Sequence, residues 1–193
     1  RQSMVVIRGS EFHLERGQVI NSSRDGISVV GAGKSSNADD IDGGVIRDIV
    51  GIRNGRDTVS LSTARYGGPR TRNIVVDNIR SYRSNARGAV EVSDGVESIV
   101  VRNIYAENGL YGLAIQDHKE ADQANQNIDI SNVYVNNCSF GINCQTDPGL
   151  THRNISVTRI NAARTYQALF MRNMQLVKIQ DIRASNPRNA RHI

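Results

Sequence analysis

The densest group of reactive side chains in the chain is the run Gln116-Asp117-His118-Lys119-Glu120. A histidine beside a carboxylate can be oriented for proton transfer, so His118 and Asp117 are candidate catalytic residues. Lys119 is a candidate cation for neutralising a substrate carboxylate. Carboxylate oxygens are the ligands that calcium prefers, so Asp117, Glu120 and Asp122 are candidate calcium ligands, although the chemistry requires no cofactor.

These residues lie within a degenerate repeat that returns every 22 to 30 residues along most of the chain. The clearest copies occupy residues 74–79, 99–104, 128–133, 155–160 and 177–182, with a looser copy at 44–49. Such self-similarity indicates one supersecondary unit stacked on copies of itself, because a single unit cannot bury its apolar face alone.

Within each copy β-branched residues recur at every second position, as at Ile99 and Val101, which predicts a strand with one buried face. An Asn or Asp then interrupts the alternation before the last apolar residue. These residue types tolerate left-handed backbone, so we predict a corner at this position. The predicted corner residues are Asp48, Asn78, Asn103, Asn132 and Asp181.

A second, shorter strand is predicted about ten residues after each copy, at residues 26–29, 88–92, 112–115 and 141–144. Each begins with Gly, which we expect to adopt a positive φ in a tight turn. Asparagines recur just upstream, and in a stack they can form a ladder of side-chain hydrogen bonds. The members of this predicted ladder are Asn21, Asn54, Asn85, Asn108 and Asn137.

The pattern resembles the right-handed parallel β-helix of the pectate-lyase-like superfamily over roughly residues 12–187. The resemblance implies an all-β fold: a single-stranded right-handed parallel β-helix, a solenoid of about 6 to 7 coils. We expect one domain over residues 1–193 and leave open that it is a fragment of a longer chain. The superfamily includes carbohydrate-active enzymes and tailspikes, so the resemblance implies a secreted or cell-surface protein.

Outward residues of the shorter strands would line up from coil to coil along one face. On this face Glu91, Gln116, Gln145 and Arg172 are candidate substrate-binding residues. Asp94 follows one of these strands, and we expect it to lie one coil from Asp117. Carboxylates that close would repel and raise the pKa of one of them, as a general acid requires, so Asp94 is a further candidate catalytic residue.

The chain has a net charge of +5, with 21 Arg against 3 Lys. Arginine binds carboxylates with a planar fork, so an acidic polysaccharide is the expected partner, although the arginines could equally pair with the 19 acids. Nucleic acid is not an expected partner because basic runs with interleaved aromatic residues are missing. No apolar stretch approaches the roughly 20 residues that span a bilayer, so no membrane partner is expected.

Several smaller features leave alternatives open. Cys144 falls in an inward slot and is expected to be a buried thiol, with a disulfide to Cys138 as the alternative. Tyr105 and Tyr134 should stack on another face, as a sugar platform or as simple cross-strand packing. An arginine stripe is expected near the second corner, formed by Arg24, Arg56 and Arg87.

Three functional hypotheses follow. The leading one is a lyase or C5-epimerase acting on an acidic, uronate-containing polysaccharide: Lys119 or Arg172 neutralises the uronate, His118 removes the adjacent proton and Asp117 orients His118. The second is a glycoside hydrolase that uses Asp94 and Asp117. The third is a non-catalytic tailspike or adhesin solenoid; because no capping helix is evident, a homotrimer or an additional chain would cover its ends.

Overall fold

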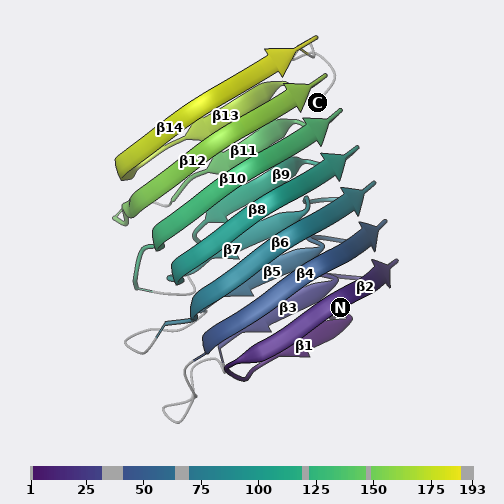
Figure 1. Ribbon diagram of the computed structural model, residues 1–193, viewed down its shortest axis with the longest axis vertical. Coiled ribbons are helices and arrows are strands. Elements are labelled where there is room, and N and C mark those ends of the chain that lie inside the picture. The colour runs from purple at the N-terminus through teal and green to yellow at the C-terminus, as the bar shows by residue number, and fades with distance from the viewer. Residues whose placement is uncertain (1, 32–40, 64–69, 119–121, 147–148, 188–193) are drawn as a thin grey trace.

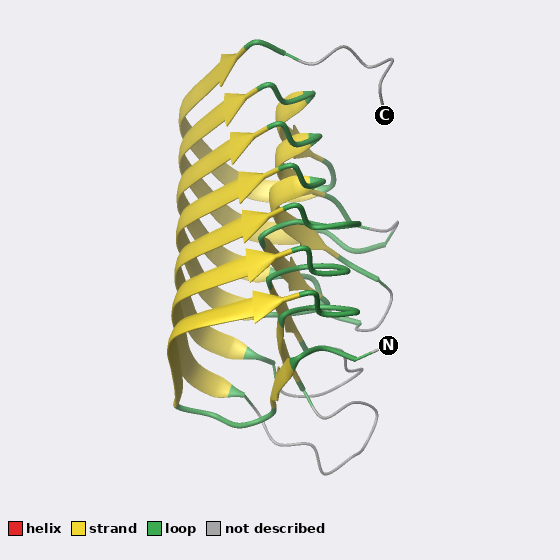
Figure 2. Ribbon diagram, turned by 90° about the vertical axis from the view of Figure 1, so that its right-hand side faces the viewer, coloured by secondary structure: helices red, strands yellow, loops and turns green. Residues whose placement is uncertain are grey.

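The computed structural model describes residues 2–31, 41–63, 70–118, 122–146 and 149–187, and all of its regular structure is β (Figures 1 and 2). Strands with odd numbers are short: β1 (Val5–Ile7), β3 (Ile27–Val30), β5 (Val59–Ser62), β7 (Val90–Ser93), β9 (Tyr111–Gln116), β11 (Phe140–Cys144) and β13 (Gln167–Met171). Strands with even numbers are long: β2 (Phe12–Ile20), β4 (Asp42–Ile52), β6 (Arg72–Tyr82), β8 (Glu97–Glu107), β10 (Gln126–Asn136), β12 (His152–Ala163) and β14 (Met174–Ser185).

The strands form two sheets of seven parallel strands each, and consecutive strands alternate between the sheets. Within each sheet the spatial order follows the chain, so each pair of strands adds one layer to the stack (Figure 1). Figure 2 shows the long strands as one layer and the short strands as the opposite layer. The structure therefore confirms an all-β chain of stacked parallel strands, which is compatible with the predicted solenoid. Among the described residues, no helix is long and apolar enough to cross a membrane.

The long strands contain left-handed residues at regular intervals of five. In β6 and its flanks these are Asn73, Asn78 and Arg83, with φ of 57°, 52° and 55°. Side chains of a strand alternate between the inner and the outer face, and each left-handed residue shifts this alternation by one position. Ile74, Val76 and Ile79 therefore all point inward. The five predicted corner residues all have positive φ, which confirms that prediction: Asp48, Asn78, Asn103, Asn132 and Asp181.

Side-chain ladders connect these corners from layer to layer. The Asn132 amide donates to the Asn103 Oδ1 at 2.9 Å and accepts from Arg159 at 2.6 Å. The predicted asparagine ladder is confirmed at one step, because Asn137 donates to Asn108. Other members take different roles: Asn54, which is buried, accepts from the backbone N–H of Ser22.

Replacing Asn132 with alanine is expected to lower the free energy of unfolding by about 2 kcal/mol. The change forces a Cβ-bearing residue without a local polar group into the left-handed region and removes a ladder of hydrogen bonds. Asn132→Gly is the matched control, because it removes only the ladder and should cost about half as much. Chemical denaturation measures both, and equal losses would show that the backbone conformation contributes nothing.

The core lies between the two sheets and consists of inward β-branched residues that repeat in register. Ile74, Ile99 and Ile128 form one such column, and each is almost completely buried. Cys144 takes the inward position beside Ile115 in the short-strand sheet, and both cysteines are buried thiols that form no disulfide. Burial raises the pKa of Cys144 to about 12, so this thiol is unreactive at neutral pH, and the alternative of a disulfide is not realised.

The glycines before the short strands differ from the prediction. Positive φ among the described glycines occurs at Gly43, Gly95 and Gly149, and not at Gly26, Gly88, Gly112 or Gly141. Their role is close approach of backbones: a Cβ on Gly88 would overlap the Tyr111 carbonyl oxygen, and one on Gly141 would overlap the Ala168 carbonyl oxygen. The prediction of a turn conformation was therefore wrong, because packing between neighbouring layers selects glycine here.

Candidate active site on the short-strand sheet

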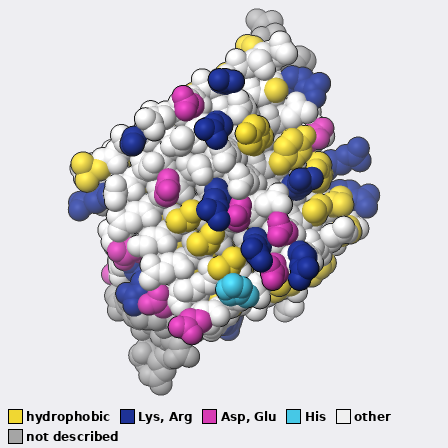
Figure 3. All heavy atoms as spheres, in the orientation of Figure 1, with side chains coloured by type: hydrophobic (Ala, Val, Ile, Leu, Met, Phe, Trp, Pro, Cys, Tyr) yellow, Lys and Arg dark blue, Asp and Glu magenta, His cyan; other side chains and the backbone are white. Residues whose placement is uncertain are grey.

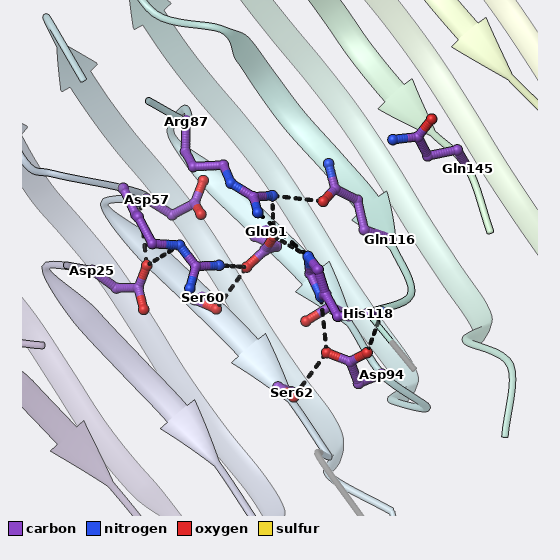
Figure 4. Close-up of polar contacts among 12 residues, drawn as sticks. Asp25, Asp57, Ser60, Ser62, Arg87, Glu91, Asp94, Gln116, His118 and Gln145 are labelled. Carbon is purple, nitrogen blue, oxygen red and sulfur yellow. Dashed lines mark hydrogen bonds and ion pairs between the residues drawn. The ribbon is translucent and has the colours of Figure 1, made fainter. Parts of the chain in front are cut away.

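The outer face of the short-strand sheet holds a polar cluster at its centre (Figure 4). Outward residues are in register as predicted: Ser60 of β5 pairs with Glu91 of β7, and Ser93 of β7 pairs with Gln116 of β9. Glu91 is nevertheless only 1% exposed, because Arg56 and Arg87 cover it from the turns that precede β5 and β7. The outward face at this point is therefore a layered site rather than an open surface.

Glu91 is the centre of this cluster. Its carboxylate accepts from the Arg56 Nη2 at 3.1 Å, the Arg87 Nη1 at 2.8 Å and the Ser60 hydroxyl at 3.2 Å. The His118 Nε2 lies 3.4 Å from its Oε1. Two guanidinium groups contact this one buried carboxylate, so Glu91 anchors the arginines from beneath. Glu91 was predicted to bind substrate. Its contacts instead indicate that it positions Arg56 and Arg87, whose guanidinium groups can contact a ligand.

Asp94 orients His118. Asp94 has a left-handed backbone, with φ of 53°, at the end of β7. The Asp94 Oδ1 accepts from the His118 backbone N–H at 2.7 Å, and the Oδ2 lies 3.1 Å from the His118 Nδ1 and accepts from the Ser62 hydroxyl at 3.4 Å (Figure 4). Burial acts to raise the pKa of Asp94, but the hydrogen bonds from His118 outweigh it and hold that pKa below its ordinary value.

His118 is held between two carboxylates and beside a guanidinium. The hydrogen bond with Asp94 is the main cause that raises the pKa of His118 above its ordinary value, while burial opposes the rise. In the neutral ring, Nδ1–H donates to Asp94 and leaves Nε2 as a proton acceptor. Nε2 lies 3.5 Å from the Arg87 Nη2, and the side chain of His118 remains 28% exposed. This is the geometry of an oriented acid–base histidine.

A depression of about 130 Å³ opens above these groups, and His118 is part of its lining. The described lining residues include three arginines and three carboxylates: Arg24, Arg56, Arg87, Asp25, Glu91 and Asp94. Their charges balance while His118 is neutral, so protonation of His118 gives these residues a net positive charge. The predicted arginine stripe is real, and the arginines are bound to carboxylates on its inner side.

Asp25 and Asp57 belong to this site and were missed from the sequence. Asp25 lies 3.5 Å from the Arg56 Nε and binds Arg24 as well. Asp57 is fully buried and accepts from the Gly88 N–H at 3.1 Å; burial and the neighbouring carboxylates raise its pKa well above the ordinary value. A signal was present, because an Arg-Asp pair precedes both β3 and β5.

A second hollow continues the site toward the C-terminal layers. It has a volume of about 440 Å³, and Arg87 lines both hollows. Its other lining residues are Leu110, Gln116, Phe140, Asn143, Gln145, Gln167 and Phe170. Phe140 and Phe170 lie with ring centroids 6.2 Å apart. Amide groups beside aromatic rings suit a ligand with hydroxyl groups and apolar faces, so Gln116 and Gln145 are placed where they can bind a substrate.

The other predicted site residues make fewer described contacts with the His118 cluster. Asp117 is half-buried next to His118, but the described contacts give the orienting role to Asp94. Arg172 is exposed after β13, two strand spacings or roughly 10 Å along the sheet from Gln116. Lys119 and Glu120 lie outside the described residues. Asp122 is exposed, and the described part of the chain contains no group of three or more His, Cys, Asp or Glu that could hold a metal ion.

A buried network supports the site from behind. The Asn125 side-chain oxygen accepts from the N–H groups of Gly95 and Val96, each at 3.0 Å, and its amide donates to the Gln116 carbonyl at 2.8 Å. The backbone N–H of Asn125 in turn donates to His152 at 3.1 Å. Gly95 follows Asp94 directly and Gln116 lies two residues before His118, so this network fixes the backbone next to both residues.

Comparison of the chain with protein-family models, with curated proteins and with solved structures gives no match. The geometry of the site is therefore the basis for its chemistry.

Proposed function

We propose that the two sheets form a single-stranded right-handed parallel β-helix of the pectate-lyase-like type, and that the protein is a lyase or C5-epimerase acting on a uronate-containing polysaccharide. The observation that supports the activity most directly is the His118 ring, which Asp94 orients at Nδ1 while Nε2 faces a pocket that contains arginines. Removal of a proton beside a carboxylate needs a base and a cation, and this site has both.

In the proposed reaction, the Nε2 of neutral His118 takes the proton from the carbon next to the uronate carboxylate. Arg87, which is 24% exposed and fixed by Glu91, stabilises the negative charge that develops on the carboxylate. In elimination, the electron pair of the broken C–H bond forms a C=C bond while the bond to the leaving sugar oxygen breaks and that oxygen takes a proton from solvent water. In epimerisation, the carbon takes a proton from solvent water on its opposite face, and His118 later releases its proton to solvent.

Other residues extend the proposed scheme. In this proposal Arg172 contacts a neighbouring sugar unit, and Gln116 and Gln145 bind hydroxyl groups between the two arginines. Lys119 remains a proposed second cation. A calcium ion held by Asp117, Glu120 and Asp122 would add positive charge near the carboxylate, and no step of the scheme depends on it. A polysaccharide substrate implies a secreted or cell-surface location.

The rate on a uronate polymer is expected to rise with pH through the raised pKa of His118, because only the neutral ring accepts a proton. The midpoint should therefore lie above the ordinary value of 6.5. Ultraviolet absorbance of the unsaturated product measures elimination, and exchange of the C5 hydrogen with deuterated solvent measures epimerisation. Neither product on any uronate polymer, or a rate that falls over this range, would contradict the proposal.

A non-catalytic assembly module is the second candidate, and the last layer favours it. Ile179 and Ile182 of β14 are each 43% exposed, whereas their in-register neighbours Val157 and Ile160 are buried. An apolar face of this kind suits contact with another chain, as in a homotrimer. Light scattering that shows a trimer, together with no turnover, would favour this candidate over the enzyme.

A further inference from the structure

A column of outward residues crosses the long-strand sheet, on the other side of the molecule from His118. In register from β6 to β14, these residues are Arg80, Tyr105, Tyr134, Asn161 and Arg183. The next column contains Tyr82, Glu107, Asn136, Ala163 and Ser185. Two rings in neighbouring layers are thus followed by an amide and a guanidinium. The proposed reaction uses none of these groups.

The second half of this column is hollowed into a groove of about 530 Å³. Tyr105 and Tyr134 form one end, and alanines and Ser185 line the part where the rings stop. Figure 3 shows hydrophobic side chains interspersed with basic ones over this end of the long strands. The groove forms because small side chains on β12 and β14 succeed large rings on β8 and β10.

Of the two tyrosine rings that line the groove, Tyr105 is held in place by its neighbours. The Tyr105 hydroxyl donates to the Glu107 carboxylate at 3.0 Å, and its ring lies 5.6 Å from the Tyr82 ring at an angle of 47°. Tyr134, by contrast, is 42% exposed. A fixed ring beside an exposed one presents an apolar surface at little cost in side-chain entropy, which suits stacking against a ligand.

The remaining groups indicate the chemistry of the ligand. Asn136 and Asn161 offer amides, Arg183 offers a guanidinium, and the described lining contains no carboxylate. Amides bind hydroxyl groups, guanidinium binds carboxylate, and tyrosine rings stack on the apolar faces of sugar rings. Successive members of one column are spaced by the strand separation of about 4.8 Å, close to the length of one pyranose ring. A glycan extended along the stack would therefore meet one side chain per sugar.

We propose that this groove is a second, non-catalytic glycan-binding site that takes a carboxylate-bearing polysaccharide running across β8 to β14. Tyr105 and Tyr134 stack on its sugar rings, and Arg183 binds one of its carboxylates. The acidic class of the glycan rests on the proposed function. The site itself rests on the groove, and it would hold a long polymer on one face while a chain is processed on the other.

The test compares binding of a uronate polymer, by affinity electrophoresis, for the wild type, Tyr134→Ala and Tyr134→Phe. Alanine should weaken binding about tenfold, because one stacked ring is lost, and phenylalanine should bind as the wild type does. Arg183→Gln should weaken binding of the acidic polymer and leave binding of its carboxyl-reduced form unchanged. Turnover of a short oligosaccharide by Tyr134→Ala should equal that of the wild type.

Unchanged polymer binding in Tyr134→Ala would overturn the inference, as would a wild type that binds no acidic polymer. Loss of self-association in Tyr134→Ala without loss of polymer binding would also overturn it, because the groove would then be an interface between copies. Failure of the proposed function gives a different result: polymer binding that depends on Tyr134, with no product formed by the wild type.

Discussion

Replacing Asp94 with asparagine is expected to lower kcat on a uronate polymer by about 10³-fold, within the range that general acid–base groups contribute. Asparagine keeps the size of Asp94 but cannot stabilise the imidazolium that forms when His118 accepts a proton. The carboxylate also raises the pKa of His118, so its removal makes His118 a weaker base. The expected pH profile of kcat has a lower plateau, and the midpoint of its rise lies at lower pH than in the wild type.

The matched control is Ser62→Ala, which removes only the 3.4 Å hydrogen bond to the Asp94 Oδ2, keeps the Asp94 carboxylate and should change kcat little. Asp117→Asn distinguishes the two assignments, because the sequence-based scheme has Asp117 orient His118 and the structure has Asp94 in that position. Pre-steady-state or initial rates over the pH range measure all three variants. A larger loss in Asp117→Asn than in Asp94→Asn would contradict the assignment of Asp94.

Acidification is expected to destabilise the protein through His152. The ring is fully buried, and desolvation lowers its pKa to about 4, although the contact with Gln145 opposes this. It accepts from the Asn125 N–H at Nδ1 and lies 3.3 Å from the Gln145 carbonyl at Nε2, which fits a neutral ring protonated at Nε2. Protonation would remove the acceptor and leave a buried charge.

The direction of this pH effect on stability follows from the pKa values of His152 in the unfolded and in the folded chain. The unfolded chain binds the proton near pH 6.5, whereas the folded chain binds it near pH 4, so stability falls as pH decreases between them. The loss reaches about 3 kcal/mol, at 1.36 kcal/mol for each unit of pKa difference. His118 acts in the opposite direction: its raised pKa adds stability below pH 6.5, and this is lost as pH rises through the folded value.

Denaturant titrations at several pH values measure this effect, and His152→Gln is the comparison. The variant should be less stable than the wild type at neutral pH, because Asn125 loses its partner, and its stability should depend less on pH between about 4 and 6.5. The same slope in the variant and the wild type would show that another group causes the acid sensitivity.

The sequence was sufficient for the architecture because each layer repeats the same physical requirements. Inward β-branched residues recur at fixed offsets, and Asn or Asp recurs where the backbone must be left-handed, so local preference and packing agree. The same regularity predicted that outward residues of the short strands line up from layer to layer, and Ser60 with Glu91 and Asn143 with Phe170 do so. The prediction for the glycines before the short strands was wrong, because glycine is required there by the close backbone of the next layer and not by a turn conformation.

The sequence by itself determined the parallel layers, their register, the buried Cys144 thiol and a polar face that includes Asp94, Gln116 and His118. Only the tertiary structure decided which carboxylate orients His118, because Asp117 is its neighbour in the chain whereas Asp94 reaches it from the adjacent strand. It likewise decided that Glu91 is covered by arginines. Adjacency in a sequence follows the chain, but a hydrogen bond depends on the direction of each side chain, and in a stack of parallel strands the nearest partners belong to the neighbouring layer.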